Sequence, residues 1–294
     1  MIPERLVLHS SRESRMRACL VCQGHLGPSP LAGLVQCRTC GFITANLDLS
    51  AAALRDLYTS KYFSGEEYRD YVAERALFDK HFRLRLKTLL KFVEDPGEKR
   101  LLEIGSAYGF FLAAAREHFA SVEGVDISAD AVAYAVETLG LRATAVDFVE
   151  YPLAQNVDVV CMWDTIEHLQ HPHLYVERAS AHMNQGGVIA MTTGDIASRM
   201  ARWRGAKWRQ IHPPTHLHYF SKATLTRLLD RCGFTVTYAG SDGAYRSLDT
   251  IAYIILNIKR QQPKIYAALK RTGLLRFDFY LNMYDIMFVI ARKR

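Results

Sequence analysis

The stretch Arg100-Leu-Leu-Glu-Ile-Gly-Ser-Ala-Tyr-Gly-Phe-Phe-Leu112 predicts a strand, a tight turn and the start of a helix. Its apolar run ends at Gly105, and good helix formers begin after Gly109. A strand that feeds a helix through such a turn directs backbone N–H groups at whatever lies beyond the strand end. Glycine has no Cβ, so a ligand can approach the backbone closely there. The stretch therefore predicts a ligand-binding turn.

Acidic residues close three of the predicted strands. Glu103 ends the first, Asp126 ends the second, 21 residues beyond Gly105, and Asp147 ends the third. A carboxylate about 20 residues beyond the glycine turn is placed to bind the ribose hydroxyls of a nucleoside. The turn lacks the G-x-G-x-x-G pattern of a dinucleotide site. We therefore expect a nucleoside ligand without a pyrophosphate.

Strands and helices alternate from residue 100 onward, which predicts an α/β fold with a doubly wound parallel sheet. A helix with apolar residues at near i, i+4 spacing, from Phe78 to Val93, comes before it. Two β-rich segments near the end, 234–239 and 285–291, predict a terminal antiparallel hairpin. The expected strands are 100–104, 121–126, 141–146, 157–162 and 187–193, and the expected helices are 109–118, 128–139, 173–183 and 221–232.

Together these motifs resemble those of the class I S-adenosylmethionine-dependent methyltransferases. The pattern Glu103-x-Gly105-x-x-x-Gly109 resembles their motif I, and Trp163-Asp-Thr-Ile-Glu167-His resembles their motif IV. The resemblance covers about residues 60–294 and implies a Rossmann-like fold that binds S-adenosylmethionine. It implies that the methionine moiety lies among Glu103, Gly105, Ser106 and Gly109, the ribose at Asp126 and Ile127, the adenine at Asp147 and Phe148, and the amino-acid tail near Trp163 and Asp164.

A tyrosine-rich stretch over residues 61–71 precedes this core. Hydroxyl groups in such number are more than a buried core needs, so Tyr62 is a candidate lid residue over the cofactor. A surface loop that packs one or two aromatic rings is the alternative.

The loop that ends Pro214-Thr-His-Leu-His-Tyr-Phe-Ser221 resembles a stretch found in many small-molecule methyltransferases. A hydroxyl acceptor needs a base, and histidine titrates near neutral pH. The candidate bases are His168 and His216, followed by His212 and His218. The alternative for each is a solvated histidine or one satisfied within the core.

Four cysteines form two C-x-x-C pairs with fourteen residues between them. This spacing is typical of a structural Zn²⁺ site, in which four thiolates leave no open coordination position. Disulfides and a redox pair are the weaker alternatives, because the surrounding sequence resembles neither a secreted scaffold nor a thioredoxin. The predicted ligands are Cys19, Cys22, Cys37 and Cys40.

The net charge of +7 is unevenly distributed. Residues 195–294 hold 18 Lys and Arg against 6 Asp and no Glu. Such asymmetry indicates either an anionic partner or a solvated basic surface. Within this part, residues 245–282 form a predicted amphipathic insertion, interpreted as a substrate cover, a dimer face, a peripheral membrane contact or an ordinary helix pair. Because no signal peptide or membrane-spanning run stands out, we expect a cytoplasmic protein.

The sequence therefore predicts three parts: a zinc-ribbon-like module over 1–48, a helical lid or linker over 49–98, and a methyltransferase domain over 99–294. The leading hypothesis is methyl transfer to a hydroxyl of a small molecule, such as a sugar, a glycan precursor or a natural product. An anionic or phosphorylated acceptor is one form of this hypothesis. An RNA base methyltransferase guided by the zinc ribbon is the second hypothesis, although motif IV argues against a nucleic-acid substrate. A non-catalytic binding module on the same fold is the third.

Overall fold

The structure is a computed structural model that describes residues 18–47 and 72–294. The candidate lid residue Tyr62 lies outside the described residues. Within the described residues, no helix is both long and apolar enough to cross a membrane.

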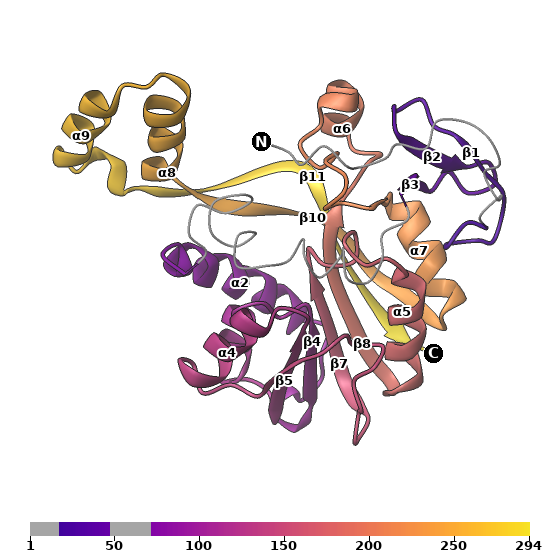
Figure 1. Cartoon of the computed structure of the whole chain (residues 1–294). Helices are drawn as coiled ribbons and strands as arrows, with labels where there is room; N and C mark the ends of the chain where they lie inside the picture. Colours follow the sequence, from indigo (N-terminus) through magenta and orange to yellow (C-terminus); the bar gives the residue numbers. More distant parts are fainter. Residues whose placement is uncertain (1–17, 48–71) are drawn as a thin grey trace.

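A seven-stranded sheet forms the centre of the molecule, in the order β10-β11-β8-β7-β4-β5-β6 (Figure 1). Five neighbouring strands are parallel, whereas β11 is antiparallel to both β8 and β10. The chain runs outward from β4 to β6 and then returns to place β7 on the other side of β4, which creates the switch in strand order where ligands of such sheets bind. The predicted fold class is confirmed. The strands are β4 (Arg100–Ile104), β5 (Ser121–Asp126), β6 (Ala143–Ala145), β7 (Val157–Trp163), β8 (Met183–Gly194), β10 (Phe234–Ser247) and β11 (Asp278–Lys293).

Helices cover both faces of this sheet because alternate strand residues point to opposite sides. On β4, Leu101 packs with the core under α2, α3 and α4, whereas Leu102 packs with the core under α5 and α7. Both side chains are almost completely buried. The helices are α2 (Arg75–Leu89), α3 (Phe110–Ala115), α4 (Ala129–Glu137), α5 (Pro172–Ala181) and α7 (Lys222–Arg231).

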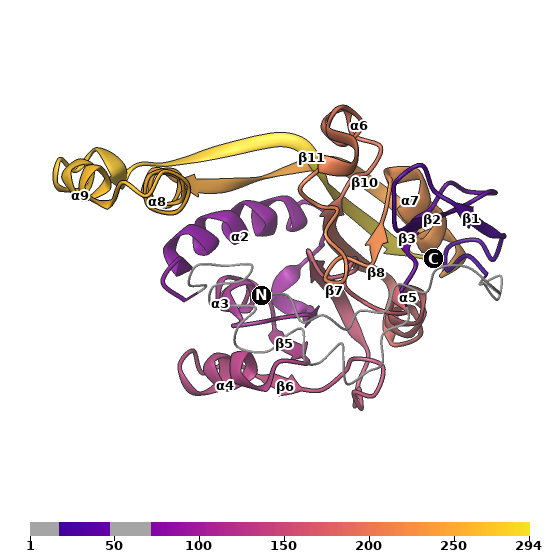
Figure 2. The same cartoon turned by 45° about the horizontal axis from the view of Figure 1, so that its top comes forward.

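The predicted terminal hairpin is present but much longer than expected. Its strands remain paired as far as Ser247 and Asp278, and they form an arm that projects from the body of the molecule (Figures 1 and 2). In the segment predicted as a helical insertion, about residues 245–282, helices occupy only Leu248 to Arg276, because the residues at both edges pair as the ends of β10 and β11. The tip of the arm holds α8 (Leu248–Tyr253), the π-helix η4 (Ile254–Lys259), α9 (Pro263–Arg271) and the short 3₁₀ helix η5 (Leu274–Arg276).

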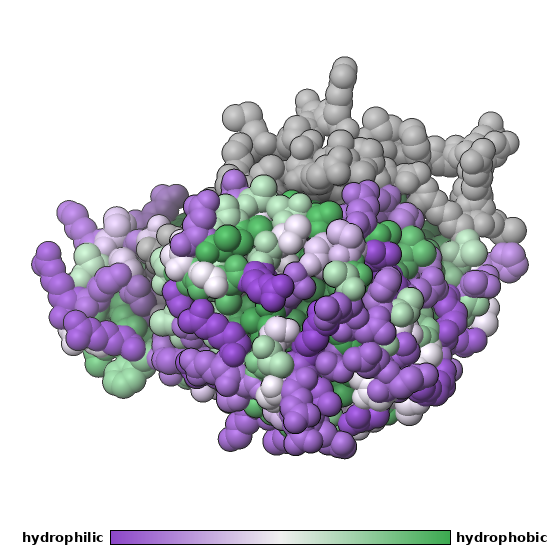
Figure 3. All heavy atoms as spheres, turned by 90° about the horizontal axis from the view of Figure 1, so that it is seen from below, coloured by the Kyte–Doolittle hydropathy of each residue, from purple (hydrophilic) through white to green (hydrophobic). Residues whose placement is uncertain are grey.

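The arm exposes apolar side chains, visible among hydrophilic ones at the left of Figure 3. Ile258 and Phe277 are 60% and 65% exposed. At the outer end of its paired strands the arm is tied to α2, where Lys80 Nζ lies 2.7 Å from Asp278 Oδ2.

The N-terminal cysteine module is joined to the α/β core through a second sheet, in the order β1-β2-β3-β9. Its last strand, β9 (His218–Tyr219), was not predicted, and it comes from the histidine-rich loop rather than from the module itself. The Phe42 ring is fully buried and packs 5.1 Å from the Phe220 ring. The predicted boundary after residue 48 stays a prediction, because residues 48–71 are not described. The first three strands are β1 (Leu26–Pro28), β2 (Leu34–Cys37) and β3 (Ile43–Ala45).

His218 connects the small sheet to the loop after β7 through both ring nitrogens. Nδ1 lies 3.0 Å from the Thr44 hydroxyl and Nε2 lies 2.7 Å from the Leu169 carbonyl oxygen. Burial lowers the pKa of His218 to about 4, whereas an unfolded histidine has a pKa of about 6.5. Between these values the unfolded chain binds a proton that the folded chain does not bind, so the free energy of unfolding decreases as the pH falls.

We predict that His218→Gln flattens this dependence. The variant lacks one proton-binding group on unfolding, so its free energy of unfolding should change less between pH 6.5 and 5, by up to about 1.4 kcal/mol per pH unit. Denaturant unfolding across this range measures the slope. His118→Gln, at an exposed position, is the control and should leave the slope unchanged. Equal slopes in wild type and His218→Gln would contradict the assignment.

Candidate functional site

A cavity of about 970 Å³ lies beyond the carboxyl ends of β4, β5, β6 and β7. Helix α2, the loop before β9 and the base of the arm complete its walls. The structure therefore brings most of the predicted cofactor residues into one space. Those that line the cavity are Glu103, Gly105, Ser106, Asp126, Ile127, Asp147, Phe148, Trp163 and Asp164.

The turn after β4 requires glycine at both predicted positions. Gly105 has φ +76°, and a Cβ there would come within 2.6 Å of the Thr165 side chain. Gly109 has φ +75°, and a Cβ there would meet Leu141 at 2.6 Å. Gly109 does not line the cavity, because it caps α3 from the far side of the turn. Its role is to let the turn pack, and it does not contact the ligand space.

Asp126 holds this turn in place. Its Oδ2 accepts a hydrogen bond of 2.8 Å from the Ala107 N–H, and its Oδ1 accepts one of 2.8 Å from the Ser128 N–H. Burial raises the pKa of Asp126, and these backbone N–H groups oppose the rise. Each carboxylate oxygen keeps further acceptor capacity. Asp126 can therefore bind a hydroxyl pair while it fixes the backbone beside it.

Glu103 has a buried carboxyl group that is not fully hydrogen-bonded within the described residues. Its side chain is 2% exposed, and among the described residues Oε2 has no hydrogen-bond partner. Burial, and next the charge of Asp126, raise the pKa of Glu103 well above its ordinary value, although Arg85 opposes them. The Ser106 hydroxyl is likewise buried and without a partner in the described part of the chain. Two such groups at the cavity wall fit a ligand that supplies hydrogen-bond donors.

Asp147 and Phe148 lie at the β6 end of the cavity. Asp147 Oδ1 accepts hydrogen bonds from the Tyr175 hydroxyl at 2.6 Å and from the Val149 N–H at 2.9 Å. The Phe148 ring is 2% exposed and packs 6.0 Å from the Tyr175 ring. Phe148 therefore borders the cavity mainly with its backbone, and its side chain belongs to the core.

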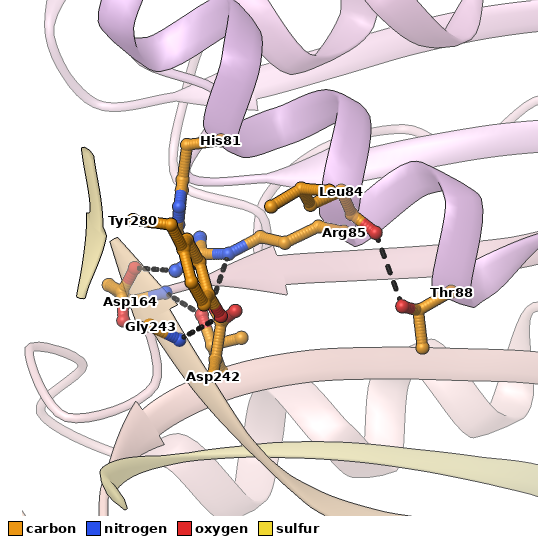
Figure 4. A network of polar contacts seen from close by, with 9 residues as sticks. His81, Leu84, Arg85, Thr88, Asp164, Asp242, Gly243 and Tyr280 are labelled. Atoms are coloured by element: carbon orange, nitrogen blue, oxygen red, sulfur yellow. Dashed lines mark hydrogen bonds and ion pairs between the residues drawn. The ribbon is translucent and has the colours of Figure 1, made fainter. Parts of the chain in front are cut away.

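Arg85, which the sequence analysis missed, ties three elements together at the cavity (Figure 4). The guanidinium is 5% exposed, donates from Nε to Asp242 at 2.7 Å, and donates from Nη2 to Asp164 at 2.7 Å. It also lies 5.4 Å from the Trp163 ring. On the sequence, Arg85 is one charge on an amphipathic helix, and its partners lie 79 and 157 residues away. No local signal identifies it.

His81, one turn before Arg85, faces the Asp242 carboxylate in Figure 4. Its Nε2 lies 3.5 Å from Asp242 Oδ2. Burial lowers the pKa of His81 to about 3, so its imidazole is neutral at physiological pH. Arg85 is therefore the positive charge that compensates Asp164 and Asp242.

Three of the four candidate bases gather on one wall of the cavity. The ring centroids of His168 and His216 are 4.5 Å apart, and those of His212 and His216 are 3.8 Å apart. Nδ1 of His168 lies 2.9 Å from the Thr215 carbonyl oxygen, and Nδ1 of His216 lies 2.9 Å from that of Gln210. A carbonyl only accepts, so each Nδ1 carries the proton. The fourth candidate, His218, does not line the cavity, because both of its nitrogens contact protein groups in the core.

Burial disfavours the charged forms of two of these histidines and of the carboxyl group beside them. It lowers the pKa of His168 to about 4 and the pKa of His216 still further. It also raises the pKa of the neighbouring Glu167 to about 8. The imidazoles of His168 and His216 are therefore neutral at physiological pH, and each has a lone pair on Nε2.

Asp285, a second missed residue, anchors the histidine loop to β11. It is 1% exposed and accepts hydrogen bonds from the Trp208 indole at 2.9 Å and from Arg209 at 3.1 Å. Asp285 also borders the cavity. These hydrogen bonds therefore fix the position of the histidine loop at the cavity wall.

The four predicted metal-ligating cysteines are brought together as expected. Cys19 Sγ lies 3.6 Å from Cys40 Sγ, and Cys22 Sγ lies 3.5 Å from Cys37 Sγ. All four sulfur atoms lie within 4.8 Å of one another. These separations exceed the roughly 2.05 Å of a disulfide and approach those of thiolates around a tetrahedral ion with metal–sulfur bonds of about 2.3 Å. The cluster therefore fits a Zn²⁺ ion.

Comparisons with known proteins agree with this geometry. A family model described as a methyltransferase domain matches residues 68–239. Magnesium protoporphyrin IX methyltransferase of Synechocystis PCC 6803, solved with bound S-adenosylhomocysteine, is 14% identical, with a TM-score of 0.54 over 83% of this chain and 100% of that one. A SAM-dependent methyltransferase of Thermotoga maritima is 17% identical, with a TM-score of 0.50 over 76% of this chain and 95% of that one.

At these identities the solved structures show a shared fold, whereas the family model spans more than half of the chain. A comparison with curated proteins finds no match. Motif I, the acids at the strand ends and the family match therefore lead to one conclusion: the chain belongs to the methyltransferase domain family and is a class I S-adenosylmethionine-dependent methyltransferase.

Proposed function

We propose that the protein transfers a methyl group to a hydroxyl of a small molecule, such as a sugar, a glycan precursor or another natural product. The observation that carries this proposal is the neutral histidine cluster on the wall of the cofactor cavity. A hydroxyl must lose its proton as it is methylated, and a neutral imidazole is the group that can accept it. The cavity of about 970 Å³ is at the upper end of small-molecule sites, which span about 300–1,000 Å³, and leaves room for an acceptor beside the cofactor.

The residues at the strand ends fit S-adenosylmethionine. Asp126 would hold the ribose hydroxyls, and the orphaned Glu103 oxygen and Ser106 hydroxyl would meet the methionine moiety. When bound, S-adenosylmethionine supplies a methyl group activated by its sulfonium. The protein must then orient the acceptor, because positioning is a large part of the barrier to an in-line displacement.

His216 is suited to move the proton. Its Nδ1–H donates to the Gln210 carbonyl, so the lone pair is on Nε2. As the acceptor oxygen bonds to the methyl carbon, the carbon–sulfur bond breaks with its electron pair on sulfur, and the hydroxyl proton passes to a histidine Nε2. His168, on the same wall, is the other candidate base.

The first prediction concerns the cofactor. Asp126→Asn removes a charged acceptor that binds both the turn and the ribose, so affinity for S-adenosylhomocysteine should fall by about 10- to 150-fold. Isothermal calorimetry with S-adenosylhomocysteine measures this change. Glu123→Gln is the matched control: Glu123 lies on the same strand and binds the Tyr151 hydroxyl, outside the cavity. Unchanged affinity in Asp126→Asn would remove Asp126 from the site.

The second prediction concerns the base. His216→Gln should lower turnover by about 10²- to 10⁴-fold while affinity for S-adenosylhomocysteine stays within about twofold, since the base does not hold the nucleoside. Release of S-adenosylhomocysteine with a panel of polyhydroxylated acceptors measures turnover, and the exposed His118→Gln is the control. Equal turnover in His216→Gln would rule out His216 as the base. Methylation of amines only would contradict a hydroxyl acceptor.

We also propose that the cysteine cluster binds a structural Zn²⁺. Because the ion would bind the folded module and hold it against Phe220, its removal by a strong chelator should lower the melting temperature. Elemental analysis should find one fewer zinc ion per chain in Cys37→Ser than in wild type. Cys232→Ala, outside the cluster, should keep the wild-type zinc content. An unchanged zinc count in Cys37→Ser would contradict the proposal.

A further inference from the structure

A second group of metal-ligating side chains lies in the cavity itself. Glu167, His168 and His216 each offer one ligand atom, and these three atoms lie within 4.8 Å of one another. Backbone hydrogen bonds hold the segments that carry these side chains next to each other. The N–H groups of Leu217 and His218 donate to the Glu167 carbonyl oxygen at 2.9 and 3.1 Å. The loop after β7 and the segment that enters β9 are therefore bound to each other at this point.

The two imidazoles are oriented as metal ligands are. Metal-binding histidines commonly donate the remote ring N–H to a carbonyl or carboxylate, which fixes the tautomer and directs the other nitrogen at the ion. His168 and His216 both donate from Nδ1 to backbone carbonyls. Their rings stand at 84° with centroids 4.5 Å apart, so Nε2 is the coordinating atom of each.

Glu167 supplies the independent observation. Its side chain is 3% exposed, and its Oε2 has no hydrogen-bond partner in the described parts of the chain. A buried carboxylate oxygen without a partner is costly. The nearby guanidinium of Arg85 makes its hydrogen bonds to Asp164 and Asp242 instead. A cation bound between Glu167 and the histidines would compensate the carboxylate.

We propose that Glu167, His168 and His216 bind one divalent transition-metal ion. Two imidazoles and a carboxylate suit Zn²⁺, Fe²⁺, Co²⁺ or Mn²⁺ better than Mg²⁺ or Ca²⁺, which prefer oxygen ligands throughout. Metal–ligand bonds of about 2.0–2.2 Å place the ligand atoms of one ion within about 4.4 Å of each other. Side-chain shifts of a few tenths of an ångström would bring the three ligand atoms from within 4.8 Å of one another into that range.

The ion would act on the acceptor. Three protein ligands leave coordination positions open, and the cluster borders the cavity. An acceptor oxygen bound there becomes more acidic and is held in a fixed position. With the Nε2 lone pairs of His168 and His216 bound to the ion, neither ring would act as the base. His212, whose ring centroid is 3.8 Å from that of His216, would accept the proton in their place, and the loss of turnover predicted for His216→Gln would then follow from loss of the ion. This role, which rests on the proposed function, favours acceptors with two adjacent oxygen donors, such as vicinal diols or hydroxy acids. The ion site does not depend on it.

Co²⁺ alone is the probe for the site. The full chain is first given one equivalent of Zn²⁺, which the four thiolates of the cysteine cluster bind in preference to the cavity site. It is then titrated with Co²⁺ by calorimetry and visible absorption. Wild type should bind one Co²⁺ without a thiolate charge-transfer band. Glu167→Gln and His216→Gln should bind Co²⁺ more weakly by at least about 100-fold, the upper range for loss of a supporting residue. Glu123→Gln and His118→Gln are the matched controls and should bind Co²⁺ as wild type does.

Affinity for S-adenosylhomocysteine shows whether each variant is folded, because none of the substitutions touches the proposed nucleoside residues. Wild-type affinity for Co²⁺ in both Glu167→Gln and His216→Gln, or no Co²⁺ bound by wild type beyond the cysteine cluster, would overturn the inference. The titration needs no acceptor, so its result is separate from that of the acceptor panel. Bound Co²⁺ with no hydroxyl methylated would overturn the proposed function alone, and hydroxyl methylation without Co²⁺ binding would overturn the ion site alone.

Discussion

The hydrogen bonds from the Ala107 and Ser128 N–H groups to the Asp126 carboxylate are the constraint on which the site depends. They link the turn after β4 to the end of β5, so the carboxyl ends of two central strands are fixed relative to each other. The left-handed Gly105 lets the same turn pass close to Thr165 without a steric clash. As a result, the acids at the strand ends face one cavity.

The cavity has walls of different electrostatic character. At the end of β7, Asp164 is paired with the buried guanidinium of Arg85, which also holds the base of the arm through Asp242. On the histidine wall, burial lowers the pKa of His168 and of His216 and so keeps both imidazoles unprotonated. Charge is thus compensated on the α2 side, whereas Glu167 on the histidine side retains a buried oxygen without a hydrogen-bond partner among the described residues.

Local patterns in the sequence predict the parallel sheet, the glycine turn and the order of the acids, because short-range periodicity and glycine spacing determine them. They do not predict Arg85 or Asp242, whose partner lies 157 residues away and whose burial depends on how α2 crosses the arm. They also miss β9, which becomes a strand only because β3 pairs with it, and they place the end of the hairpin too early. His218 has the same local appearance as His216, and only the tertiary contacts separate a core histidine from a cavity histidine.

A crystal structure with S-adenosylhomocysteine tests the central claim most directly. The account predicts that the ribose hydroxyls lie within hydrogen-bond distance of Asp126 and that the sulfur faces the wall formed by His168, His212 and His216. A nucleoside bound elsewhere, or a sulfur turned away from these histidines, would contradict it.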